Sequence, residues 1–249
     1  MGSKGNKRHV KRLNTPKYLH IEKKIGKYFY NTRAGPHPKR ISIPLGSLLR
    51  DVLHVVDNHE EARKIIKMKK VLVDGVVRTD PRFPVGLMDI VEIPDLEKVY
   101  RILPKWKKGL VPQEVDKKES SFKLCRIENK TTIKNGNVQL NLHDGRNILI
   151  SVKDPKKPKE DTYNTMGVLK IKVPTQEIVE YYPLKENSPI LVMRGKNLGM
   201  NGVVTKIEKR FGPNASIVKI KTSKEEVHET AYAYSFVVGK LKPVIQLEE

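Results

Sequence analysis

Lysine and arginine are the residues of this chain whose type and spacing point most clearly to a chemistry. Arg63, Lys64, Lys67 and Lys70 follow one another closely in a segment with helical character. At roughly 100° per residue they cover a different arc from the apolar residues at 62, 65 and 66. A cationic helix face can lie along a phosphate backbone, although a charge run is often only a solvated face. The stripe by itself leaves both interpretations open.

The segment from Ser42 to Ile93 must position this stripe. Apolar residues recur at helical spacing from Leu45 to Val56 and predict a first helix with one buried face. Asn58 followed by Glu61 is a capping-box variant that predicts the start of a second helix. Asp74-Gly75, between two apolar runs, predicts a two-residue hairpin turn. The sequence therefore predicts a compact helix–helix–hairpin module with cations on its second helix.

The N-terminal segment carries much of the positive charge. Residues 1–41 hold 12 lysines and arginines against one glutamate. Contact with phosphates releases counterions, so such an arm favours a polyanionic partner. Tyr18, Tyr28, Phe29 and Tyr30 lie among these cations and could stack on unpaired bases. The alternative is that the rings dock the arm onto the domain behind it.

Residues 32–40 (TRAGPHPKR) predict an extended basic loop that prolines stiffen. His37 stands between two prolines and has no nearby histidine or cysteine in the sequence. This isolation favours a backbone or phosphate contact at His37 over metal ligation.

Composition narrows the class of partner. The chain has 249 residues, 49 Lys+Arg, 28 Asp+Glu and a net charge of +21, enough length for two or three modest domains. The charge favours nucleic acid or an anionic membrane, but no apolar run approaches the roughly 20 residues of a membrane span. The basic first forty residues lack the apolar core of a signal peptide. The single Cys125 excludes an internal disulfide framework, and we expect a reducing, cytoplasmic setting.

The second half of the chain has the pattern of β-strands. Between residues 120 and 186, Asn135-Gly136 and Asp144-Gly145 bracket an alternating apolar strand, which predicts a meander. After about Pro189, a glycine-punctuated loop spans residues 194–202 between two apolar strands. This loop lacks the Gly-Lys-Ser/Thr ending of a P-loop and precedes a strand, which disfavours a nucleotide site. A tight loop that brings backbone, Arg194 and Lys196 close to RNA is the better interpretation.

Taken together, these motifs resemble the archaeal and eukaryotic (e-type) family of ribosomal small-subunit protein four over nearly the whole chain. HVKRLNTPKY and AGPHPKR resemble the opening signature of that family. KKVLVDGVVRTDPRFPVGLMDIV is similar to an rRNA-binding helical module, and PILVMRGKNLGMNGVVTKIEKR resembles a KOW motif, with Gly199 and Gly202 at its glycine positions. The resemblance implies a structural, non-enzymatic protein that holds small-subunit rRNA in the cytoplasmic ribosome. It implies neighbouring small-subunit proteins as partners and a monomer within the particle, with no cofactor, metal, membrane or small-molecule substrate.

The predicted fold is a multi-domain α+β chain. We expect a basic N-terminal arm (1–41), a helix-helix-hairpin rRNA-binding module (42–103), a linker (104–119), a central β-rich domain (120–186) and a C-terminal SH3-like KOW barrel (187–249). The residues predicted to bind rRNA are Lys7, Arg8, Lys11, Arg12, Lys17, Arg33, His37, Lys39, Arg40, Arg50, Arg63, Lys64, Lys67, Lys70, Arg194, Lys196 and Asn197.

Two other functions compete with this prediction. RNA-modifying enzymes carry a similar helical module, but Asp74, Asp80 and Asp89 are explained by turns and loops, and the seven histidines have no metal or triad spacing. A transcription–translation factor could use a KOW barrel for transient contacts. Resistance of the bound protein to a high-salt wash distinguishes a structural component from a factor.

Overall fold

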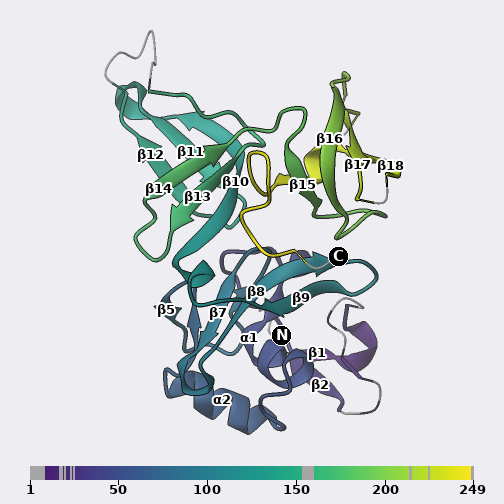
Figure 1. The fold of residues 1–249 in the computed structure, drawn as a ribbon. Helices are drawn as coiled ribbons and strands as arrows, with labels where there is room; N and C mark the ends of the chain where they lie inside the picture. Colours follow the sequence, from purple (N-terminus) through teal and green to yellow (C-terminus); the bar gives the residue numbers. More distant parts are fainter. Residues whose placement is uncertain are drawn as a thin grey trace, which may run out of the picture. The chain divides into compact units, whose positions relative to one another are not determined.

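The computed structural model describes residues 9–16, 19, 21–22, 24, 26–152, 160–212, 215–223 and 225–247. The chain folds into two compact units, each mostly of β-strands with few helices (Figure 1). The first unit comprises residues 1–103 with 108–114, and the second comprises residues 104–107 with 115–249. Among the described residues, no helix is long and apolar enough to span a bilayer.

Both helices predicted for the first unit are present. Helix α1 spans Leu45–Ser47 and continues as a π-helical turn over Leu48–Val52. Its leucines lie in one core with Ala62 and Ile66 of α2 (His59–Lys67), as the apolar spacing predicted. The N–H of Asn58 donates to the Glu61 carboxylate at 3.4 Å, so the predicted capping box at the start of α2 is confirmed.

Short strands surround these helices and form three sheets. The strand order of the largest is β5-β4-β7-β8-β9, while β3 pairs with β6 and β1 with β2. The bounds are β1 His9–Lys11, β2 Tyr28–Tyr30, β3 Ile43–Pro44, β4 Leu72–Val73, β5 Val76–Val77, β6 Pro84–Val85, β7 Ile90–Ile93, β8 Lys98–Lys105 and β9 Gly109–Glu114. Asp74 and Gly75 between β4 and β5 both have positive φ, 52° and 68°, which confirms the predicted hairpin turn.

Strand β9 corrects the linker predicted over residues 104–119. Residues 109–114 pair with β8 at the edge of the five-stranded sheet. Gly109, Pro112 and the neighbouring lysines gave this stretch the composition of a linker. An edge strand tolerates proline and lysine because one side of its backbone needs no ladder partner.

In the second unit, an antiparallel sheet of order β12-β11-β10-β13-β14 contains the predicted meander. The bounds are β10 Phe122–Thr132, β11 Val138–Leu142, β12 Asn147–Ile150, β13 Val168–Lys172 and β14 Ile178–Tyr182. Asn135, Gly136 and Gly145 have positive φ in the turns that the sequence predicted. Alternating residues such as Leu140 and Ile171 form the core of this sheet.

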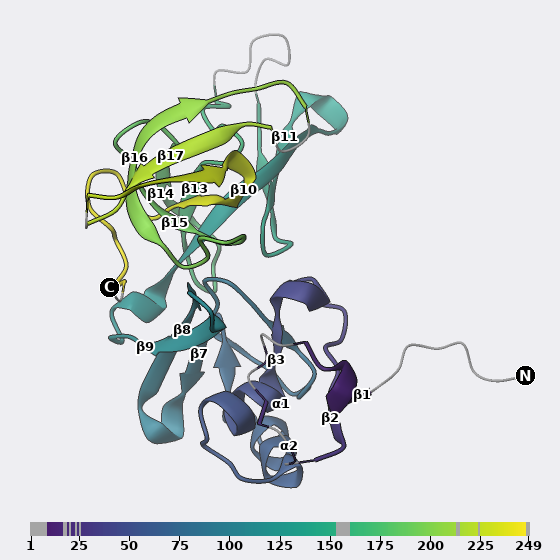
Figure 2. The ribbon, with the colours of Figure 1, turned by 90° about the vertical axis from the view of Figure 1, so that its right-hand side faces the viewer.

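A second sheet of the same unit has the order β18-β17-β16-β15-β19. The bounds are β15 Pro189–Val192, β16 Asn201–Glu208, β17 Ile217–Lys221, β18 Val227–Ala231 and β19 Ser235–Val237. Figure 2 shows that β16 is strongly curved. A Cβ on Gly202 would lie 2.6 Å from the Lys221 carbonyl oxygen, so only glycine allows β17 to approach this closely.

Arg126 connects the two sheets of the second unit. Its guanidinium, on β10, donates to the carbonyls of Ala233 and Ser235 at 2.8 and 2.9 Å and pairs with Glu128. The side chain is almost completely buried. A buried guanidinium requires this full set of acceptors, which fixes the β19 segment against β10.

Candidate nucleic-acid interface

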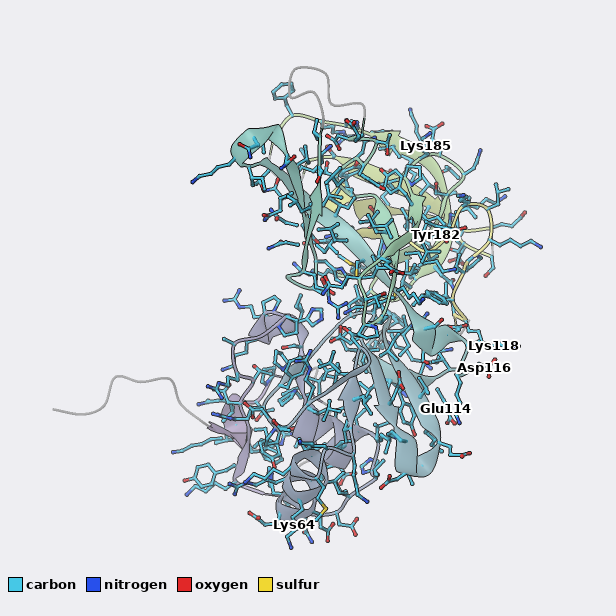
Figure 3. The ribbon with its side chains drawn as sticks, turned by 90° about the vertical axis from the view of Figure 1, so that its left-hand side faces the viewer. Lys64, Glu114, Asp116, Lys118, Tyr182 and Lys185 are labelled. Atoms are coloured by element: carbon cyan, nitrogen blue, oxygen red, sulfur yellow. The ribbon has the colours of Figure 1, made fainter. Side chains whose placement is uncertain are left out.

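Three of the four cations of the predicted stripe lie on the solvent-facing side of α2, and the fourth, Lys70, follows the end of this helix at Lys67. Arg63, Lys64 and Lys67 are exposed, whereas Ala62 and Ile66 on the opposite side are fully buried. Figure 3 shows Lys64 at the outer side of the helix, directed away from the body of the unit. The helix therefore presents ammonium and guanidinium groups on a convex surface that a phosphate backbone can reach.

Two further predicted cations already have acidic partners at the surface. Lys70 Nζ lies 2.6 Å from a carboxylate oxygen of Asp95, and Arg33 Nη1 lies 3.3 Å from one of Asp80. The Arg33 side chain is 66% exposed, and the Lys70 pair is also open to solvent. Exposed pairs of this kind contribute about 0–1 kcal/mol, so either cation can exchange its carboxylate for a phosphate at little cost.

A groove of about 600 Å³ lies beside the stripe. Its walls come from residues 28–30 and 33 of the N-terminal segment, from residues 59, 60, 63 and 67 of α2, and from the loop 79–82. The N–H of Arg33 donates to the carbonyl of Arg82 at 2.9 Å and so connects the first wall to the third. Three segments distant in sequence thus form one concave site with more cationic than acidic side chains.

Of the three aromatic residues of β2, two pack against the rest of the unit and one is largely exposed. Phe29 is buried, with the Arg50 guanidinium 5.2 Å from its ring centroid. The Tyr30 hydroxyl donates to the His59 carbonyl at 3.1 Å, and the two rings meet edge to face at 4.4 Å. These two rings dock the arm, as the alternative interpretation proposed. Tyr28 is 47% exposed and borders the groove, so it is the most exposed residue of the three.

Burial changes the ionisation of the groups that anchor β2. The pKa of His59 is lowered, first by burial and then by the Arg50 charge. Burial also raises the pKa of Tyr30. The imidazole at the groove wall is therefore neutral at pH 7, and the phenol keeps its proton as a hydrogen-bond donor.

Arg50 corrects the predicted set of RNA-binding residues. Its residue exposure is only 8%, and its Nε and Nη2 donate to the two carboxylate oxygens of Asp51 at 2.7 and 3.0 Å. This bidentate pair neutralises the guanidinium inside the unit. The Arg50 guanidinium contacts the ring of buried Phe29 and does not reach the surface, where a phosphate could bind it.

His37 is the second correction. The residue is 3% exposed, and its Nε2 lies 2.9 Å from a carboxylate oxygen of Asp89. The other carboxylate oxygen accepts from the Gly86 N–H at 2.8 Å. The histidine is part of a buried polar cluster beneath the basic loop, so its side chain cannot contact a phosphate from this position.

The remaining arm residues differ in accessibility. Lys11, Lys39 and Arg40 are exposed. Arg12 instead donates to the carbonyls of Ile21 and Glu22 at 2.7 and 3.2 Å. These hydrogen bonds connect two parts of the arm. The predicted ligands Lys7, Arg8 and Lys17 lie outside the described residues, as does Tyr18, one of the four rings predicted to stack.

The glycine-punctuated loop before β16 exposes Arg194 and Lys196. Asn197 uses its side-chain amide to donate to the Glu229 carbonyl at 3.1 Å, so it shapes the loop. Gly199 has a φ of +79°, and a Cβ there would lie 2.8 Å from the Pro104 carbonyl oxygen. The glycine thus serves both the turn and a close backbone approach.

Sequence reasoning did not select the loop 79–82. Arg82 lines the groove, and its N–H donates to the Asp80 carboxylate at 2.9 Å in a tight turn. The sequence RTDPRFP could have indicated this loop, because arginines flank an Asp-Pro turn in it. Only the folded chain brings this turn next to Arg33 and α2.

A buried polar cluster in the second unit contains the other concentration of reactive groups among the described residues. One ligand-type atom from each of Cys125, His143 and Asp144 lies within 4.8 Å of the others. Asp144, however, already pairs with Lys123 Nζ at 3.1 Å and Arg146 Nε at 3.2 Å. Because two cations already neutralise this carboxylate, the site disfavours a metal ion. The residues form a structural ion-pair cluster instead.

Three family models match the chain. The model described as RS4NT (NUC023) domain matches residues 4–40, the S4 domain matches residues 54–91, and Ribosomal family S4e matches residues 96–178. The S4 match contains α2 and the loop 79–82, which are two of the three walls of the groove.

Curated relatives match over their full length. The chain is 46% identical to small ribosomal subunit protein eS4 of Desulfurococcus amylolyticus, over 100% of this chain and 99% of that protein. It is 44% identical to the protein of the same name from Methanocaldococcus jannaschii, over 99% and 100%. Among solved structures, the 30S ribosomal protein S4e of Thermoplasma acidophilum matches with a TM-score of 0.66 and 27% identity, over 80% of this chain and 95% of that one.

Proposed function

Because the chain belongs to the ribosomal S4e family, we propose that it is a structural component of the small ribosomal subunit that binds and stabilises folded rRNA. The relatives are named as ribosomal subunit proteins and not as enzymes. The observation that carries the proposal is the exposed cationic side of α2 with the groove beside it, two of whose three walls lie inside the S4 match. These groups neutralise rRNA phosphates from a rigid scaffold.

The roles of the individual segments are part of this proposal. Residues 1–41 act as a basic arm, 42–103 as the rRNA-binding module, 120–186 as a central β domain and 187–249 as an SH3-like KOW barrel. Support for the last comes from the curved five-stranded sheet and from exposed Arg194 and Lys196 in the loop before β16. Within the cytoplasmic ribosome the protein is a monomer whose partners are small-subunit rRNA and neighbouring small-subunit proteins.

The decisive experiment measures binding of the full chain to small-subunit rRNA across a salt series. The test variant carries Arg63→Glu, Lys64→Glu and Lys67→Glu, all at exposed positions of α2. The dependence of log K on log salt has a slope of about −0.9 per phosphate neutralised on duplex DNA and about −0.7 on single strands, and rRNA contains both paired and unpaired stretches. We therefore expect weaker binding together with a shallower slope by about two to three.

A matched control reverses three exposed lysines outside the proposed surface, Lys117, Lys118 and Lys185. Two of them, Lys118 and Lys185, are labelled in Figure 3. The control removes the same charge from the chain, so it corrects for net charge. Equal losses in the two triple variants would refute the assignment of α2 as the binding face. Wild-type affinity in the α2 variant would do the same.

A further inference from the structure

We propose that the groove beside α2 holds one unpaired nucleotide of the bound RNA, with its base against the Tyr28 ring and its phosphate among the arginines that line the same groove. This inference rests on the proposed function and adds the class of ligand that the groove takes. The cationic side of α2 is convex and meets a helical phosphate backbone. The groove is a different kind of surface and requires a different ligand.

The size of the groove suits a single nucleotide better than a paired helix. Its volume of about 600 Å³ falls within the range of sites that enclose small organic ligands. A duplex is far wider than such a site and touches only its rim. Proteins that recognise RNA in detail commonly receive unstacked nucleotides from loops and bulges in concave sites like this one.

Tyr28 supplies a preorganised stacking surface. Its neighbours on β2 are fixed, Phe29 by burial and Tyr30 by its hydrogen bond to the His59 carbonyl. The backbone of Tyr28 pairs with Lys11 of β1. The ring therefore stands on an anchored strand while 47% of the residue remains exposed. Lys27 Nζ lies over this ring, 5.6 Å from its centroid, and adds positive charge beside it.

The charges around the groove fit a phosphate. Arg33, Arg63, Lys67 and Arg82 oppose two acidic side chains, Glu60 and Asp80, which leaves an excess of two positive charges. The Arg33–Asp80 pair is exposed and weak, so a phosphate can replace the carboxylate. Arginine forks bind phosphate oxygens in pairs, which suits a nucleotide held at one end and stacked at the other.

The test uses the full chain bound to small-subunit rRNA and three single variants. Tyr28→Ala removes the ring, Tyr28→Phe keeps it, and Lys64→Ala removes one charge from the convex side of α2. Stacking of one base on an aromatic ring contributes enough that its loss weakens binding by about tenfold. Tyr28→Ala should lose about tenfold in affinity with an unchanged salt slope, and Tyr28→Phe should bind like wild type. Lys64→Ala should make the slope shallower by about one.

Ultraviolet crosslinking of the same wild-type complex, followed by mass spectrometry, provides the direct readout. We expect a nucleotide adduct on Tyr28 and its attachment to an unpaired position of the RNA. Wild-type affinity of Tyr28→Ala, or an adduct that maps to a paired position, would overturn the inference while rRNA binding itself stands. If the wild-type chain does not bind rRNA, the proposed function fails instead.

Discussion

Asp144 offers the sharpest test of the energetics of the second unit. Its carboxylate is buried and receives Lys123 Nζ at 3.1 Å and Arg146 Nε at 3.2 Å. Burial alone would raise the pKa of this carboxyl group. The charges of Lys123, His143 and Arg146 outweigh burial and lower its pKa from 3.8 to about 2. The folded state therefore binds the ionised form of Asp144 more strongly than the unfolded chain does.

The substitution Asp144→Asn removes this charge without changing the shape of the side chain. A pKa lowered from 3.8 to about 2 corresponds to about 2.4 kcal/mol, at 1.36 kcal/mol per pKa unit. The variant also leaves Lys123, whose side chain is 1% exposed, without its carboxylate. Removal of one partner from a buried pair typically costs about 3–5 kcal/mol. We expect a loss of about 3 kcal/mol at pH 7.

Two measurements report this loss. Urea unfolding at pH 7 gives the change in the free energy of unfolding, and hydrogen exchange of amides in β10–β12 locates it in this sheet. The pH dependence has a definite sign. Because the folded pKa is lowered, the stabilisation is present above the unfolded pKa near 3.8 and disappears as the pH falls towards 2. Asp144→Asn should flatten this acid-side decline.

The matched control is Asp95→Asn, the same substitution in the exposed pair with Lys70. An exposed pair contributes about 0–1 kcal/mol, so the control should change the free energy of unfolding little. If Asp144→Asn costs no more than Asp95→Asn, the reasoning from burial is wrong. The same conclusion follows if the wild-type decline between pH 4 and pH 2 persists unchanged in Asp144→Asn.

Two further substitutions test packing in each unit. Gly86→Ala places a Cβ in steric conflict with the ring of buried His37, so thermal unfolding should show a loss of about 1–3 kcal/mol. An unchanged melting temperature would contradict the packing described. Arg126→Met removes the donors to the carbonyls of Ala233 and Ser235. We expect a loss of about 1–3 kcal/mol in the free energy of unfolding and faster hydrogen exchange in β19. Protection of β19 equal to that in wild type would show that the guanidinium does not hold this segment.

Local sequence signals predicted the secondary structure around the site well. The Asn58–Glu61 cap, the Asp74-Gly75 turn and the apolar spacing of α1 and α2 depend on residues a few positions apart. Their energetics are settled within one turn or one hairpin, so the sequence carries them directly. The linker over 104–119 failed because composition does not reveal whether a neighbouring strand offers hydrogen bonds.

The candidate site was only partly accessible to the same reasoning. The exposed cations of α2 follow from helical periodicity, because their arc lies opposite the buried Ala62 and Ile66. Arg50 and His37 have the same kinds of neighbours in sequence, yet both are buried beside an aspartate. For His37 that aspartate, Asp89, is 52 residues away, and no local pattern encodes the pairing.

The amino-acid sequence by itself determined the charge of the arm, the cationic side of α2, the turns and the family resemblance. The tertiary structure alone decided which cations face solvent and which are neutralised inside, and it assembled the groove from Tyr28, Arg33, α2 and the loop 79–82. The reason is physical. Periodicity and turn chemistry act over a few residues, whereas burial, ion pairing and concavity depend on segments that only folding brings together.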